Sequence, residues 1–97
     1  MSDEIERITL DLTNCKYVME LHERMRVALD FPEWYGCNLD ALWDLLREPR
    51  TTHLTIHGVH TMSKDCRKAF LKMIPVFDEV VEWQRHWKLY FNYDILD

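Results

Sequence analysis

Acidic and aromatic side chains are concentrated in one stretch of the chain, residues 30–48. The stretch holds five carboxylates and one base, Arg47, so its net charge is −4, whereas the whole chain carries −5. It also holds two of the four tryptophans. Ionised carboxylates are strong hydrogen-bond acceptors for arginine and histidine, and tryptophan is enriched in protein interfaces. We therefore interpret this stretch as the surface through which the protein binds a partner.

A short helix is predicted over residues 39–48. Asn38 precedes it and can cap its first turn, because the side-chain oxygen can accept a hydrogen bond from a free backbone N–H. Pro49 ends it, since the residue before a proline disfavours the helical conformation. Four leucines fall on one side of this helix and are expected to pack against the rest of the domain: Leu39, Leu42, Leu45 and Leu46.

The other side of the predicted helix groups two carboxylates with an indole. At about 100° per residue, Asp40, Trp43, Asp44 and Arg47 lie in one arc of about 100°. We expect Asp40, Trp43 and Asp44 to face outward together. The alternative is that Trp43 covers the edge of the leucine core, while the acids are solvated and Asp40 complements the helix dipole.

The loop before this helix, residues 30–37, contains adjacent aromatic residues, Trp34 and Tyr35. Two neighbouring rings in a loop can rarely both be buried, so one is expected to anchor the loop and the other to form an exposed stacking surface or to be partly covered. Pro32 ends the preceding helix and fixes one bend, and Gly36 is expected to supply a positive φ.

Six elements are expected to position these residues. Alternating apolar residues predict strands over 7–12 and 52–58, and a third strand is predicted over 88–96. Helical periodicity predicts helices over 16–29 and 64–86, the latter capped by Ser63 and kinked or split at Pro75. The order β-α-α-β-α-β favours a small three-stranded parallel sheet packed with helices, an α/β fold, in one domain over residues 1–97.

Composition argues against several functional classes. An acidic chain with pI near 5.5 is a poor nucleic-acid binder, and no apolar run is long enough to span a membrane. The N-terminus lacks a signal-peptide pattern, and the three cysteines have neither disulfide nor zinc spacing, so we expect a reducing cytoplasm.

No metal site is expected from His53 and His57, which would lie about 13 Å apart on one face of a strand. Asp40 and Asp44 could in principle be an acid/base pair, but they share one exposed helix face, whereas such a pair needs a substrate between its members. We therefore expect no enzyme, no catalytic residues and no cofactor.

The segment Pro32 to Asp44, PEWYGCNLDALWD, closely resembles the signature motif of the barstar family of intracellular ribonuclease inhibitors. The segment Val76 to Glu79 is similar to an acidic helical segment of that family. The resemblance implies a three-stranded parallel sheet with helices. It also implies a protein partner, a basic ribonuclease of the barnase type bound 1:1, and the oligomeric state of the chain itself stays open.

Carried over residue by residue, the resemblance implies that Asp44 enters the phosphate site of the ribonuclease and pairs with its arginine and histidine residues. It implies that Asp40 flanks this contact on the same helix and that Glu79 adds charge from a neighbouring helix. Carboxylates would thus mimic RNA phosphates. The other partner-binding positions that it implies are Trp34, Gly36, Asn38, Leu39 and Trp43.

The chain also departs from the family pattern. Trp34 stands where the family has a contacting tyrosine, and Arg47, Glu48 and Pro49 replace a smaller, neutral segment. Arg47 facing a basic enzyme is unfavourable unless it pairs with a neighbouring acid or with an acid on the partner, so we expect these positions to affect which ribonuclease is bound. The alternative functions are an acidic interaction module or a toxin-immunity protein (an antitoxin) whose partner is not a barnase-type ribonuclease.

Overall fold

The chain folds in the predicted order, β-α-α-β-α-β, and the predicted α/β fold with a three-stranded parallel sheet is confirmed. The computed structural model describes residues 4–96. The strands are β1 (Glu6–Asp11), β2 (Thr52–His57) and β3 (Phe91–Ile95). The helices are α1 (Val18–Ala28), α2 (Leu39–Leu46) and α3 (Lys64–His86), and a short 3-10 helix (Val59–Thr61) lies between β2 and α3.

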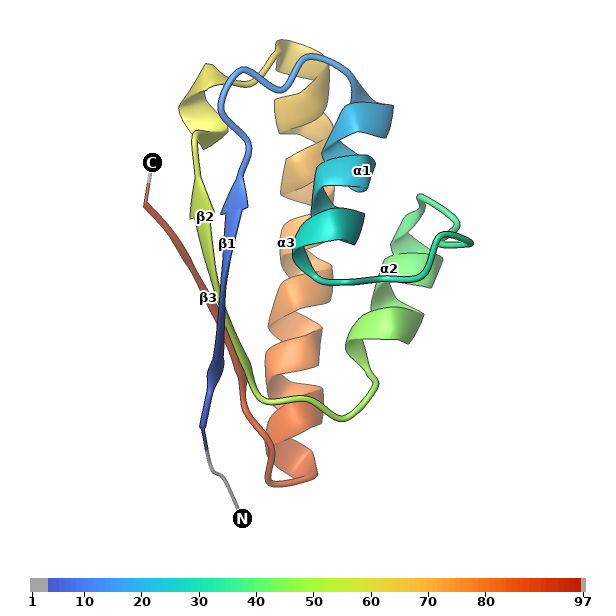
Figure 1. Ribbon diagram of the computed structural model, residues 1–97, viewed down its shortest axis with the longest axis vertical. Coiled ribbons are helices and arrows are strands. Elements are labelled where there is room, and N and C mark those ends of the chain that lie inside the picture. The colour runs from blue at the N-terminus through green and yellow to red at the C-terminus, as the bar shows by residue number, and fades with distance from the viewer. Residues whose placement is uncertain (1–3, 97) are drawn as a thin grey trace.

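The sheet has the order β1-β2-β3, and both pairs of neighbouring strands are parallel. All three helices lie on one side of it, with α1 and α3 nearest the strands and α2 farther out (Figure 1). Leu10, Leu54 and Ile56 are fully buried, which confirms the predicted alternation of strand residues. The predicted third strand was too long, because Lys88 adopts a positive φ of 61° in the turn after α3 and pairing begins only at Phe91.

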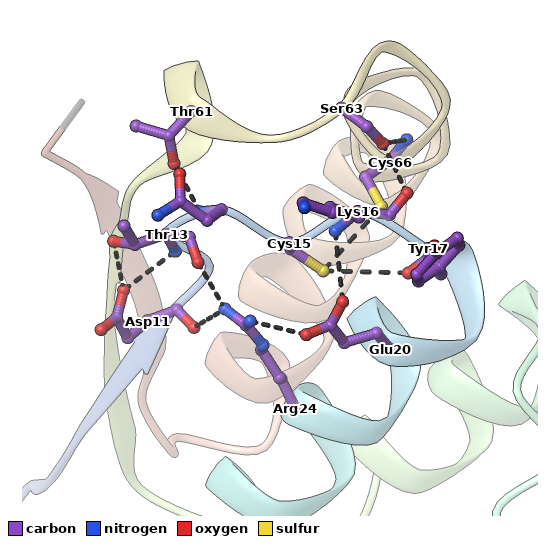
Figure 2. Close-up of polar contacts among 11 residues, drawn as sticks. Asp11, Thr13, Cys15, Lys16, Tyr17, Glu20, Arg24, Thr61, Ser63 and Cys66 are labelled. Atoms are coloured by element: carbon purple, nitrogen blue, oxygen red, sulfur yellow. Dashed lines mark hydrogen bonds and ion pairs between the residues drawn. The ribbon is translucent and has the colours of Figure 1, made fainter.

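The connection from β1 to α1 is held by a network of polar contacts (Figure 2). Asp11 accepts hydrogen bonds from the backbone N–H and the hydroxyl of Thr13, at 3.0 and 2.6 Å, and these bonds lower the pKa of its carboxyl. Arg24 donates to the carbonyl oxygens of Asp11 and Thr13 and forms an ion pair with Glu20 at 2.7 Å. The turn at Thr13 and Asn14 is therefore tied to the first helix.

Two of the three cysteines meet in this region, although all three are free thiols. Cys15 and Cys66 are fully buried, and their sulfur atoms lie 3.8 Å apart. Burial raises the pKa of Cys15 to about 12, so its thiol stays protonated at neutral pH. These two residues therefore pack as small apolar groups.

The first helix ends earlier than predicted, at Ala28, and Pro32 is not what ends it. Asp30 adopts a positive φ of 56°, and its N–H bonds the carbonyl of Val27 while the N–H of Phe31 bonds the carbonyl of Arg26. This pair of bonds is the Schellman C-cap, which satisfies the last free carbonyls of the helix. Phe31 is then buried, and it directs the following loop toward the core.

Helix α3 is not split at Pro75. It runs unbroken from Lys64 to His86 with the proline in its interior, and Ser63 caps its start by accepting from the Cys66 N–H at 3.2 Å. Phe70, Phe77 and Val80 lie in its buried stripe, so tertiary packing outweighs the hydrogen bond that the proline removes. No helix among residues 4–96 combines the length and apolar character that crossing a membrane requires.

Candidate functional site

Asn38 sets the start of α2 and thereby the directions of the acids on it. Its backbone is extended, with φ −144° and ψ 170°, and its side-chain Oδ1 accepts from the Ala41 N–H at 2.8 Å. Its Nδ2 donates to the carbonyl of Gly36 at 3.0 Å. The predicted N-cap is confirmed, and the same side chain also ties the preceding loop to the helix.

Gly36 does not have the positive φ predicted for it; Cys37 does, with φ 52°. Gly36 is instead a position of close approach. A Cβ atom there would lie 3.2 Å from Asn38 Nδ2 and 3.4 Å from Ala41 Cβ. Any side chain at this position would therefore press on the cap that begins α2.

The leucine side of α2 is buried as predicted at Leu42, Leu45 and Leu46, but not at Leu39. Leu39 is the first residue of the helix and is 37% exposed. It lines a pocket of about 510 Å³ that residues of α1 and α3 also border. The helical phase was correct, but the core does not extend under the first turn.

Asp40 and Asp44 are exposed on α2, as predicted. Within residues 4–96, Asp40 makes no hydrogen bond or ion pair, and Asp44 meets only Arg47, at 3.4 Å. The Asp44 side chain keeps 66% of its surface exposed. Both carboxylates are therefore accessible to another molecule.

Trp43 does not face outward between these acids; it is half-buried at the edge of the core. Its ring packs edge-on against Trp83 of α3, with centroids 6.1 Å apart. The Arg47 guanidinium lies over both indoles, 5.4 Å from the centroid of Trp43 and 5.3 Å from that of Trp83. Trp43 thus joins α2 to α3, which is the alternative considered for it.

A groove of about 620 Å³ opens between α2 and α3 and brings Trp43 together with Glu79. Glu79 is exposed, as its proposed role requires. Sequence reasoning did not assign the other lining residues to the site. A spacing of four along the predicted helix relates three of them to one another and the fourth, Trp83, to Glu79, which indicates shared faces. These additional residues are Asp78, Glu82, Trp83 and His86.

Asp78 differs from the other acids of the groove because it is already engaged. It accepts a hydrogen bond from the Tyr93 hydroxyl at 2.6 Å. Burial and this bond raise the pKa of Tyr93 to about 12. Asp78 thus links α3 to β3, and Glu79 and Glu82 are the freer acids.

The two aromatic residues of the loop divide their roles as the sequence suggested. Tyr35 is 5% exposed, and its hydroxyl lies 2.9 Å from Nδ1 of the buried His22. Burial raises the pKa of Tyr35 and lowers that of His22. Trp34 is 76% exposed, so most of its surface is open to solvent while its neighbour anchors the loop.

This surface can bind another molecule through its charged carboxylates and its aromatic rings. No group of three or more His, Cys, Asp or Glu residues among residues 4–96 is arranged to hold a metal ion. His53 is hydrogen-bonded to Tyr90 at 2.8 Å and to Asp94 at 2.7 Å. Exposed carboxylates beside indole rings match a partner that offers arginine, lysine or histidine side chains.

Comparison with known proteins supports the motif found in the sequence. The family model described as Barstar (barnase inhibitor) matches residues 5–94. The chain is also similar to a protein of Bacillus subtilis (strain 168) named "Putative ribonuclease inhibitor YrdF", with 43% identity over 42 residues. That match covers 43% of this chain and 46% of the relative, so it spans less than half of either protein.

Proposed function

Because the chain belongs to the barstar family, we propose that it is a protein inhibitor of a basic, barnase-like ribonuclease. The observation that carries this proposal is the set of exposed carboxylates on α2 and α3, Asp40, Asp44 and Glu79. Trp43 and Glu79 line one groove, and Asp44 adjoins it through Arg47, which contacts both tryptophans. In this proposal the acids act as one surface supported by two helices.

A carboxylate can block a ribonuclease because it resembles the substrate in charge but not in reactivity. The active site of such an enzyme is basic, since it must bind phosphates and stabilise the negative charge that develops during cleavage. Asp40, Asp44 and Glu79 would occupy phosphate positions and accept charge-assisted hydrogen bonds from its arginine and histidine residues. A carboxylate has no ester to cleave, so the site is filled without turnover.

The loop before α2 would supply the shape of the contact. Trp34 offers a free ring, and Gly36 permits the tight approach between the loop and the cap. Asn38 and Leu39 are exposed at the start of α2. In this proposal one inhibitor binds one ribonuclease, and Asp44 lies at the centre of the contact.

The biological setting proposed is the cytoplasm of a cell that makes, or is exposed to, such a ribonuclease. The inhibitor would act there as an immunity protein or antitoxin. It would protect cellular RNA by binding the enzyme before the enzyme meets its substrate.

The test is a titration of barnase with the purified protein while cleavage of a fluorogenic RNA substrate is followed. We expect activity to fall in proportion to added inhibitor until it is lost near one equivalent. Binding without loss of activity would instead identify an interaction module. Cleavage of RNA by the protein alone would identify an enzyme, and either result would refute the proposal.

A further inference from the structure

Arg47 places a cation inside the proposed acidic surface. It follows the last residue of α2, and its carbonyl oxygen accepts a hydrogen bond from Trp83 Nε1 at 3.2 Å. Its guanidinium lies over the rings of Trp43 and Trp83 and 3.4 Å from Asp44. The residue is thus held at its backbone and at the end of its side chain.

The hydrogen-bonding capacity of this guanidinium is mostly unused. An arginine side chain has five N–H donors. Within residues 4–96, the Arg47 side chain donates a single long hydrogen bond, to Asp44, and 40% of its surface is exposed. Arg24, by comparison, donates to two carbonyl oxygens and to Glu20. Donors are therefore left on Arg47 for an acceptor from another molecule.

Contact with a uniformly basic surface would be unfavourable at this position. A partner cation opposite Arg47 would face a like charge, which disfavours association, and it would compete with Arg47 for Asp44. Withdrawal of the side chain would give up the cation–π contacts with both indoles. A partner carboxylate, in contrast, could take a bidentate pair of hydrogen bonds from the planar guanidinium.

On the basis of the proposed function, we propose that Arg47 determines which ribonuclease is inhibited. The cognate enzyme presents an aspartate or glutamate opposite Arg47, beside the basic site that receives Asp44. Ribonucleases with lysine or arginine at that place are inhibited less tightly. Arg47 thus acts by repelling wrong partners as well as by pairing with the right one.

The first experiment uses barnase as the probe and measures inhibition constants for the wild type, Arg47→Gln and Arg47→Lys. We expect Arg47→Gln to inhibit barnase at least tenfold more tightly than the wild type, since it removes the charge and keeps a polar side chain. Arg47→Lys keeps the charge and should stay within threefold of the wild type. Arg7→Gln makes the same charge change at an exposed position of strand β1, away from α2, and should change inhibition less than twofold.

The second experiment exchanges charges on the enzyme. Each lysine and arginine of barnase whose change leaves RNA cleavage measurable is changed singly to glutamate, and the panel is tested against the wild type and Arg47→Gln. We expect at least one reversal that improves inhibition by the wild type tenfold or more and does not improve inhibition by Arg47→Gln. Such rescue requires direct pairing, and a merely structural role of Arg47 would not produce it. Urea unfolding of each inhibitor variant verifies that it is folded.

Two outcomes separate this inference from the proposed function. If the wild type and Arg47→Gln inhibit barnase and every member of the panel equally, within twofold, the role of Arg47 is wrong and the inhibitory function stands. If neither inhibits any enzyme of the panel, the proposed function falls and this inference falls with it.

Discussion

Asp44 is the residue on which the proposed interaction most depends. It is exposed on α2 and has only a long contact to Arg47 within the described residues. We expect Asp44→Ala to weaken binding to the inhibited ribonuclease more than any other single truncation, by at least tenfold or about 1.4 kcal/mol. The matched control is Glu23→Ala, which removes an acid from a similar ion pair with Arg26 on α1. A change in the dissociation constant of less than threefold for Asp44→Ala would contradict its central role.

His22 makes stability depend on pH, because it is buried beside the Tyr35 hydroxyl. Burial lowers its pKa from the ordinary value of 6.5, so below that pH the unfolded chain binds a proton more readily than the folded chain. The contribution of neutral His22 to the free energy of unfolding is therefore fully present above about pH 6.5. It is lost as the pH falls toward the folded-state pKa of His22.

Urea unfolding between about pH 7.5 and 5 tests this linkage, and His22→Gln should flatten the decline in the free energy of unfolding. The pKa values of Asp11, Glu20 and Glu23 are also lowered, but these acids act at lower pH, because their ordinary values are 3.8 to 4.5. If the free energy of unfolding declined equally with falling pH in the wild type and in His22→Gln, His22 would not be the group that causes the decline.

At the scale of elements, the start of α2 connects folding to recognition. Asn38→Ala removes the cap and should cost about 1 kcal/mol of stability. Because the cap also ties the loop to the helix that carries Asp40 and Asp44, we expect weaker ribonuclease binding as well. Ser63→Ala removes the corresponding cap of α3 and should lower stability without changing affinity. Chemical unfolding and inhibition titrations of both variants distinguish the two effects.

Helix α3 carries a proline in its interior, and this position offers a route to a more stable protein. Pro75→Ala would restore a backbone N–H and improve helix propensity, so we expect a gain of roughly 1–3 kcal/mol in the free energy of unfolding. Pro49→Ala is the control, because Pro49 lies outside the helices, between α2 and β2. Removing a proline there mainly raises the conformational entropy of the unfolded chain, so it should not stabilise the protein. Thermal unfolding that showed no gain for Pro75→Ala would indicate that α3 accommodates the exposed proline at no net cost.

For the whole molecule, the net charge of −5 and its concentration near α2 predict long-range attraction to a basic enzyme. Raising the salt concentration from about 25 to 300 mM should therefore slow association strongly and change dissociation much less. Stopped-flow measurement of both rates tests this expectation. The association rate of Asp40→Asn, which lacks one negative charge, should depend less steeply on salt than that of the wild type. A wild-type association rate that is insensitive to salt would indicate a different binding surface.

The features that could be predicted from sequence are those that local chemistry determines. Alternation placed Leu10, Leu54 and Ile56 on the buried face of the sheet. The side chains of Asn38 and Ser63 begin helices because each satisfies a free N–H within the next turn. The exposure of Asp40 and Asp44 follows from helical phase against the buried leucines. Helical phase describes directions around one axis, so it cannot say which other helix will lie alongside.

The sequence by itself determined the β-α-α-β-α-β order and the family motif with its acids. Only the tertiary structure decided what those acids lie beside. Trp43 meets Trp83, a residue far along the chain, and Arg47 lies over both rings. The positive φ falls on Cys37, and Gly36 is instead a position of close approach. These outcomes depend on how α2 packs against α3 and on the exact path of the loop, and long-range packing of this kind has no signature in the local spacing of residues.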